Sequence, residues 1–213
     1  MTLKLAALSL GPIGANGYIA ADSDSGEAVV IDPGGDAPVV MATAKQMGAT
    51  LKAIWLTHAH FDHWGGVADL VRALDLPVAL HSLELPLYRN LGGAKQWGVP
   101  MQPGPEPTIL LDDHATGRTK LEVGNLKFEV FFVPGHTVGH VAFYEKAAGV
   151  IFGGDVLFQG SIGRTDFPGG DFDTLIHSIR TQFLTLPDPT VVLSGHGPQT
   201  TVGEERRFNP FLS

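Results

Sequence analysis

Four side chains that can bind a metal ion lie within six consecutive positions, in the segment Thr57-His58-Ala59-His60-Phe61-Asp62-His63. This segment directly follows an apolar stretch that is typical of a strand. The chain of 213 residues has nine histidines, so three in one heptapeptide are hard to attribute to core packing. Imidazole and carboxylate ligands without thiolates suit zinc or another divalent ion of intermediate softness. The segment therefore predicts a metal site.

The spacing within this segment divides its ligands between two ions. Residues two apart on an extended chain project to the same side, so His58 and His60 can share one ion. A glycine pair then allows a tight turn into a helix, which places Asp62 and His63 near the helix N-terminus, where a carboxylate is favoured. Because close neighbours in such a turn cannot all reach one ion, Asp62 and His63 are assigned to a second ion.

Three more candidate ligands each follow a predicted strand and a glycine, namely His136, Asp155 and His196. Alone, a histidine at a strand end is usually a satisfied surface or core residue, and an aspartate after Gly-Gly is usually a turn or cap residue. A structural zinc site closes with four ligands, whereas seven favour a binuclear catalytic site with an exchangeable solvent ligand. The predicted assignment is His58, His60 and His136 for one ion, Asp62, His63 and His196 for the other, and Asp155 as a bridge.

An alternating order of strands and helices must position these ligands. Hydrophobic patterning predicts strands over residues 3–10, 18–22, 28–32, 51–56, 77–81, 119–123, 126–133, 140–145, 150–153 and 190–193. It predicts helices over 36–47, 67–74 and 172–183, a partly helical segment over 83–97, and an irregular proline-rich loop over 98–107. Two strand-rich halves with helices outside suggest two packed sheets in a four-layer sandwich. No composition break marks a linker, so we expect one domain over residues 1–213.

Composition and charge exclude several classes of protein. The formal net charge of −8 and the lack of a basic run argue against nucleic-acid binding. With no cysteine there is neither a disulfide framework nor thiolate chemistry from the protein. The N-terminal residues lack the apolar core of a signal peptide, and no apolar stretch reaches the length of a membrane span. We expect a cytoplasmic protein that binds no membrane; its oligomeric state is left open.

The ordered ligands His58-x-His60-x-Asp62-His63, His136, Asp155 and His196 resemble those of the metallo-β-lactamase superfamily. The resemblance covers nearly the whole chain and implies the αββα four-layer sandwich, with the metals at one edge between the two sheets. It also implies that Asp32 supports the ligand loops through hydrogen bonds, although an aspartate before Pro-Gly is equally a turn former. It makes His140 a supporting or structural residue, not a ligand.

Narrower motifs resemble the hydroxyacylglutathione hydrolases, the glyoxalase II group, in their short single-domain form. These motifs are Gly135-His136-Thr137-x-Gly139-His140, the run 160–171 and the ending 195–211. The larger glyoxalase II enzymes carry a C-terminal helical domain that we do not expect here. Their substrate-binding Lys and Tyr fall at Arg164 and Asp166, and Gly197-Pro198 replaces the acidic residue and tyrosine that follow their last histidine ligand. These departures leave the carrier thiol open.

The resemblance implies hydrolysis of a thioester such as S-lactoylglutathione to a hydroxy acid and a free thiol, by a metal-bound hydroxide that Asp62 orients. Two divalent ions, zinc first and iron or manganese as alternatives, would lower the pKa of bound water to about 7. Their net positive charge favours a small anionic substrate. Arg164 is the predicted ligand of the substrate's anionic group, the alternatives being a solvated arginine or a pair with Asp166. Arg206 and Arg207 are expected in an exposed tail.

Other chemistries remain open at this point. Iron-dependent persulfide dioxygenases of the same superfamily share a Gly-Arg-Thr-Asp-Phe run with this chain, and His58, His136 and Asp155 could form the facial triad of one iron. A lactamase is less favoured because the motifs beyond the ligands resemble thioesterases. A nuclease would be expected to carry a basic surface and an added domain. A metal binder without turnover would need no open coordination position.

Overall fold

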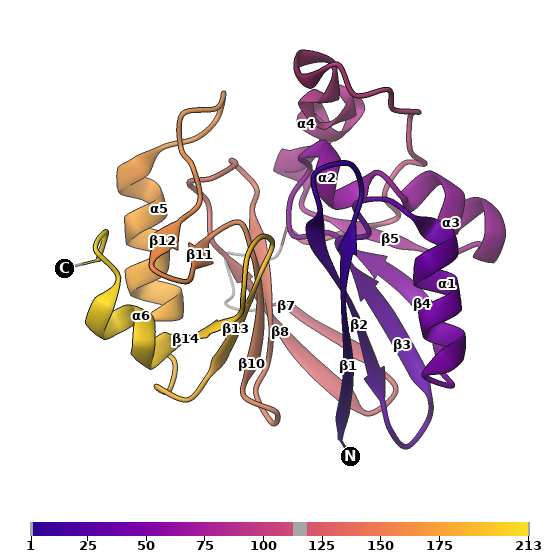
Figure 1. Ribbon diagram of the computed structural model, residues 1–213, viewed down its shortest axis with the longest axis horizontal. Helices are drawn as coiled ribbons and strands as arrows, with labels where there is room; N and C mark the ends of the chain where they lie inside the picture. Colours follow the sequence, from indigo (N-terminus) through magenta and orange to yellow (C-terminus); the bar gives the residue numbers. More distant parts are fainter. Residues whose placement is uncertain (1, 113–118, 213) are drawn as a thin grey trace. The chain divides into compact units, whose positions relative to one another are not determined.

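A computed structural model describes residues 2–112 and 119–212, which fold into two compact units (Figure 1). The first unit comprises Met1–Leu111 and Glu122–Lys127, and the second comprises Asp112–Leu121 and Phe128–Ser213. The first carries the ligand segment that begins at His58, and the second carries His136, Asp155 and His196. A single domain over the whole chain stays a prediction.

The first unit is built on a six-stranded mixed sheet with the strand order β1-β2-β3-β4-β5-β6. The strands are β1 (Leu3–Leu10), β2 (Ala15–Asp22), β3 (Glu27–Ile31), β4 (Thr50–Trp55), β5 (Val78–Leu80) and β6 (Ile109–Leu110). The β1–β2 and β2–β3 pairs are antiparallel, and the pairs from β3 to β6 are parallel. Because parallel strands end at one edge of a sheet, the loops after β3 and β4 come together there.

Two helices connect the parallel strands and cover one face of this sheet, α1 (Ala37–Gln46) and α3 (Val67–Leu74), as Figure 1 shows. The core between them and the sheet includes Ile19, Val30 and Ile54 from the strands and Val40 and Leu70 from the helices, all fully buried. Both helices match their predicted ranges to within one residue at each end. Each helix packs its apolar face on the sheet and so holds in place the strands whose ends carry the predicted ligands.

The segment between β5 and β6 is partly helical, as predicted. It contains η1 (Ser82–Glu84), α4 (Leu85–Arg89) and η2 (Leu91–Trp97), and the short helix α2 (Phe61–Trp64) precedes α3. The proline-rich stretch 98–107 has no regular structure, as expected. It is attached to α4, because Tyr88 donates a hydrogen bond to the carbonyl of Pro105 and Arg89 forms two hydrogen bonds with Glu106.

The second sheet has the strand order β14-β13-β10-β9-β8-β7. Its strands are β7 (Thr119–Val123), β8 (Leu126–Phe132), β9 (Val141–Glu145), β10 (Val150–Gly154), β13 (Val191–Ser194) and β14 (Thr200–Thr201), and a separate hairpin consists of β11 (Leu157–Phe158) and β12 (Ser161–Ile162). The β10–β13 pair is parallel. Asp155 follows β10 and His196 follows β13, so these two ligands come from adjacent parallel strands that end at the same edge.

Helices α5 (Phe172–Ser178) and α6 (Val202–Phe208) lie along one face of the second sheet in Figure 1. Leu175 and Val202 from these helices pack with Phe131 and Ile151 of the strands. The predicted helix over 172–183 is regular only in its first part, because Ile179–Phe183 forms a π-helical turn, η3. Among the described residues, no helix is both long enough and apolar enough to cross a membrane.

Arg206 and Arg207 are exposed, as expected, but the prediction of a tail is wrong, because both residues belong to the helix α6. Arg206 donates to the carbonyls of Leu184 and Leu186, and Arg207 donates to the carbonyl of Gly203. The helix begins at the cap residue Thr201, whose hydroxyl accepts a hydrogen bond from the backbone of Glu204. The sequence contains this start signal as Thr-x-x-Glu.

Candidate metal centre

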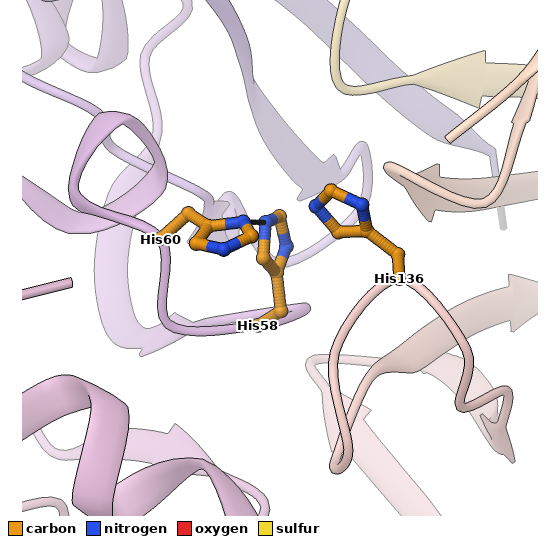
Figure 2. A group of neighbouring side chains, drawn as sticks. All are labelled: His58, His60 and His136. Carbon is orange, nitrogen blue, oxygen red and sulfur yellow. Dashed lines mark hydrogen bonds between the residues drawn. The ribbon is translucent and has the colours of Figure 1, made fainter. Parts of the chain in front are cut away.

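His58 and His60 bring two ring nitrogens together on the loop after β4, as Figure 2 shows for these two side chains. His58 Nε2 and His60 Nδ1 are 3.1 Å apart, and the two rings are nearly perpendicular, at 89°. Two ligand atoms that each lie about 2.0–2.1 Å from a tetrahedral zinc ion are about 3.3 Å from one another. The pair is therefore spaced as two ligands of one ion, which agrees with the division made from the sequence.

Asp62 and His63 form a second pair within the short helix α2. His63 Nε2 lies 3.4 Å from Asp62 Oδ2, again close to the separation of two ligands on one tetrahedral ion. Both side chains are buried, so little bulk water would compete with them for an ion. Asp62 lies in the first turn of α2, where the N-terminal end of a helix favours a carboxylate.

In the second unit, one carboxylate oxygen lies between two imidazoles. Asp155 Oδ2 is 3.5 Å from His136 Nε2 and 3.6 Å from His196 Nε2. His136 lies at the tip of the loop after β8 (Figure 2). Both distances match the separation of two ligand atoms that share an ion. These three side chains of the second unit could therefore hold a divalent ion, and the shared oxygen of Asp155 would be available to an ion on the side of either histidine.

The tautomer of His136 is set by a backbone carbonyl. His136 Nδ1 lies 2.7 Å from the carbonyl oxygen of Arg164. A carbonyl oxygen only accepts hydrogen bonds, so Nδ1 carries the proton and Nε2 keeps a lone pair. Such a contact fixes the ring and raises the basicity of the nitrogen that binds a metal. The Nε2 atom that faces Asp155 would thus be the atom that binds an ion.

Asp32 performs the same task for two histidines of the first unit. Its Oδ1 accepts a hydrogen bond from the Thr57 amide at 2.8 Å, and its Oδ2 accepts from the Thr57 hydroxyl at 2.6 Å and from His63 Nδ1 at 3.0 Å. The Thr57 hydroxyl uses its only proton on Asp32, so it accepts from His58 Nδ1, 3.0 Å away. In the neutral imidazoles of His58 and His63, these contacts place the proton on Nδ1 and leave Nε2 with a lone pair. The hydrogen bonds implied for Asp32 are present.

His140 supports the backbone next to Asp155. Its Nε2 accepts a hydrogen bond from the Asp155 amide at 3.1 Å, and the side chain is fully buried. The nitrogen used in this contact has no lone pair left for an ion. This agrees with the supporting role implied for His140 by the sequence.

The side chain of Arg164 pairs with Asp166, whereas its carbonyl group contacts His136. Its guanidinium donates to both carboxylate oxygens of Asp166, at 2.7 and 2.6 Å, and lies 3.8 Å from the ring centre of Phe167. Hydrogen bonding by Arg164 lowers the pKa of Asp166 to about 2, so this pair is ionic at neutral pH. Its pairing with Asp166 is the alternative that the sequence left open, and a role in substrate binding stays a prediction.

Gly163 is a site residue that the sequence did not single out. A Cβ atom there would lie only 1.9 Å from the carbonyl oxygen of Asp155 and 3.4 Å from His136 Nδ1. The absence of a side chain lets the turn before Arg164 pack on the ligand loop, which brings the Arg164 carbonyl to His136. The signal for this role is the glycine-flanked run that precedes the arginine.

Replacing Gly163 by alanine is expected to push the turn off Asp155 and to weaken metal binding about 10–100-fold, the usual effect of losing an outer partner. Overpacking of this kind also destabilises the fold by about 1–3 kcal/mol. Zinc titration and thermal unfolding measure the two effects. In the control Gly153→Ala, the nearest atoms belong to the side chains of Phe183 and Val192, the closest at 3.2 Å. Equal zinc affinity of the two variants would contradict this role of Gly163.

The donor set fits divalent metal ions. The first unit supplies two ligand pairs, and the second supplies two histidines around one carboxylate. All are nitrogen and oxygen donors, with tautomers fixed by outer partners where the contacts define them. Two mixed sheets with flanking helices and these donors define the protein as a metalloprotein of the α/β class.

The chain belongs to the metallo-beta-lactamase superfamily, whose sequence model matches residues 10–196. It is 43% identical over 213 residues to the probable metallo-hydrolase YqgX of Bacillus subtilis, and the alignment covers 99% of this chain and 98% of that protein. It is 39% identical over 192 residues to the hydroxyacylglutathione hydrolase GloC of Haemophilus influenzae, with 89% of each chain covered. The chain is thus a metal-dependent hydrolase by family.

Solved structures confirm the predicted fold class, the metallo-β-lactamase fold with two mixed sheets flanked by helices. The BLEG-1 B3 metallo-beta-lactamase matches with a TM-score of 0.91 at 42% identity, covering 99% of this chain and 100% of that one. TTHA1623 in a di-iron-bound form matches with a TM-score of 0.87 at 44% identity, covering 97% and 100%.

Proposed function

We propose that this protein hydrolyses a small anionic thioester, such as S-lactoylglutathione, at a centre of two divalent ions, with zinc the first choice. The proposal assigns His58, His60 and His136 to one ion, Asp62, His63 and His196 to the other, and Asp155 to both. The observation that carries it is the single Asp155 oxygen at ligand spacing from two histidines. The two ligand pairs of the first unit supply the matching halves of each site.

When bound, a divalent pair lowers the pKa of water to about 7 and polarises the thioester carbonyl. The chain's own residues prepare this chemistry. Asp62 is the catalytic residue that orients the attacking water by accepting a hydrogen bond from it. Asp32 keeps protons off the ligand nitrogens of His58 and His63. The leaving thiol has an ordinary pKa of about 8.5, so it departs as a thiolate without a dedicated general acid.

A thioester is favoured over other carbonyl substrates by two observations. The sequence shares its glycine-rich run 160–171 and its Gly-His-Thr motif with the glyoxalase II group, and the relative GloC is a hydroxyacylglutathione hydrolase by name. An excess of positive charge remains when two divalent ions are balanced by Asp62, Asp155 and one hydroxide. An anionic carrier such as glutathione suits that excess.

Arg164 is proposed to release Asp166 and to bind the anionic group of the substrate in its place. Arg164→Ala is then expected to raise KM about tenfold and to leave kcat nearly unchanged, because a lost charged hydrogen bond weakens ground-state and transition-state binding alike. Asp166→Asn should lower KM by removing the competing carboxylate. Steady-state kinetics on S-lactoylglutathione measure both. The matched control is Arg89→Ala, which breaks the similar exposed pair with Glu106; the same KM for all variants would contradict the role of Arg164.

A second candidate is oxidation of glutathione persulfide at one iron held by His58, His136 and Asp155. The di-iron-bound form of TTHA1623, which is 44% identical to this chain, supports iron as the metal, although that form holds two ions and not one. Hydrolysis of a β-lactam is the third chemistry to measure, because BLEG-1 is a B3 metallo-beta-lactamase by name.

The deciding experiment combines metal analysis of the purified protein with three activity measurements. These follow hydrolysis of S-lactoylglutathione, oxygen uptake with glutathione persulfide, and hydrolysis of a chromogenic cephalosporin. We expect two zinc ions per chain and thioester hydrolysis that a chelator abolishes and added zinc restores. One iron per chain with oxygen uptake, or lactam turnover without thioester turnover, would overturn the proposal.

A further inference from the structure

We infer that Glu84 is a positioning residue for one of the two metal ions, the one assigned to His58 and His60. The inference depends on the proposed metal centre. Glu84 is fully buried at the end of η1, and its Oε2 accepts a hydrogen bond from the Ala59 amide at 2.8 Å. Ala59 is the residue between the two ligands. Glu84 therefore holds the peptide link that sets the directions of both imidazoles.

The other side of Ala59 is held as well. The indole Nε1 of Trp64 donates a hydrogen bond to the Ala59 carbonyl at 3.0 Å, and both residues are buried. Two ligands at positions i and i+2 point to the same side only while the residue between them is extended. With its amide and its carbonyl both bound by side chains, Ala59 is held in one backbone conformation, in which the ligand nitrogens of the flanking histidines are 3.1 Å apart.

The segment that carries Glu84 also supports the ligand loop from behind. A Cβ atom at Gly92 would lie 2.6 Å from the Ala59 carbonyl oxygen and 2.3 Å from the Phe61 amide nitrogen, so the backbone of η2 packs directly on the loop. η1 itself is capped by His81, whose Nδ1 accepts from the Leu83 amide. Helices η1 and η2, to which the proposed chemistry assigns no task, thus form a support for the His58–His60 loop.

The expected effect is confined to one ion. Glu84 acts on the peptide between His58 and His60, whereas His63 of the other pair is held by Asp32. The carboxylate is a stronger acceptor than a neutral amide oxygen, so its charge contributes to the grip on Ala59. Loss of an outer partner lowers metal affinity about 10–100-fold. A variant at Glu84 should therefore lower the affinity for one ion and leave the affinity for the other unchanged.

The test is zinc binding by the full chain in competition with a chromophoric chelator. In Glu84→Ala, we expect one ion to bind about 10–100-fold more weakly and the other to keep its affinity, with Glu84→Gln intermediate. Thermal unfolding of the metal-free proteins reports any loss of fold separately. The matched control is Glu145→Ala, which removes another buried carboxylate that accepts a backbone hydrogen bond, from Ala148 at 2.5 Å. It should keep both affinities.

Unchanged binding of both ions by Glu84→Ala would overturn the inference, as would an equal loss at both sites that Glu145→Ala reproduces. If Glu84→Ala does not fold, Glu84→Gln decides, and wild-type affinity for both ions then counts against the role. A wild-type protein that binds no zinc would overturn the proposed function as well. Wild-type binding of two ions with an unaffected Glu84→Ala would overturn the inference alone.

Discussion

Replacing Asp155 by alanine is expected to abolish measurable thioester hydrolysis and to weaken the binding of both ions together. The reason is that one oxygen of this carboxylate lies at ligand spacing from His136 and from His196. Its loss removes a ligand and a negative charge from each site. The effect should exceed the roughly 100-fold that loss of an outer partner costs. Metal content after dialysis and kcat/KM of the reloaded protein measure the two effects.

The control for this variant is Asp22→Ala. Asp22 is also buried, and it accepts hydrogen bonds from Ser25 and Asn125 at a turn of the first unit. Its loss should lower stability and leave two ions bound. Asp155→Asn keeps an oxygen ligand but not the charge, and should retain part of the affinity. Two tightly bound ions in Asp155→Ala would contradict the bridging role.

Replacing Asp32 by alanine is expected to weaken the binding of both ions for a different reason, because it changes the histidine tautomers. Without this carboxylate, His63 Nδ1 loses its acceptor, and the Thr57 hydroxyl is free to donate its proton to His58 Nδ1. His58 would then carry its proton on Nε2, the atom assigned to the metal. We expect a loss of about 10–100-fold in affinity at each site. The buried amide of Thr57 is left without its acceptor, which costs about 1–3 kcal/mol of stability.

Two further variants divide the effect of Asp32 between the sites. Thr57→Val removes the hydroxyl that links Asp32 to His58 and keeps the contact of Asp32 with His63, so the affinity for only one ion should fall. Asp32→Asn keeps an acceptor oxygen but no charge, and should fall between the wild type and Asp32→Ala. Nitrogen chemical shifts of the imidazoles report the tautomers directly. Unprotonated Nε2 atoms on His58 and His63 in Asp32→Ala would contradict this account.

The ligand pairs could be predicted from the sequence because they depend on short-range geometry. The spacing of His58 and His60 on an extended segment, and of Asp62 and His63 in a turn, is fixed by backbone periodicity. His136, Asp155 and His196 were found because each follows a strand and a glycine. The parallel pairing of β10 with β13, which brings the last two to one edge, is a long-range property that hydrophobic patterning does not contain.

The outer partners could not be predicted in the same way. The Arg164 carbonyl that orients His136 is a backbone atom, so the residue type carries no signal for it. The side chain of the same residue pairs with Asp166 in the structure and is proposed to bind an anionic substrate, and sequence alone does not rank these two partners. Glu84 lies 25 positions after Ala59 and reaches it only through the packing of η1 on the ligand loop. The start of α6 at Thr201, by contrast, had a readable cap signal.

Anomalous diffraction from zinc-loaded crystals tests the central claim most directly. The account predicts two ions per chain, about 3.5–4 Å apart, with an oxygen of Asp155 bound to both. One ion should be bound by His58, His60 and His136, and the other by Asp62, His63 and His196. A single ion, or two ions whose ligands come from only one of the two units, would contradict it.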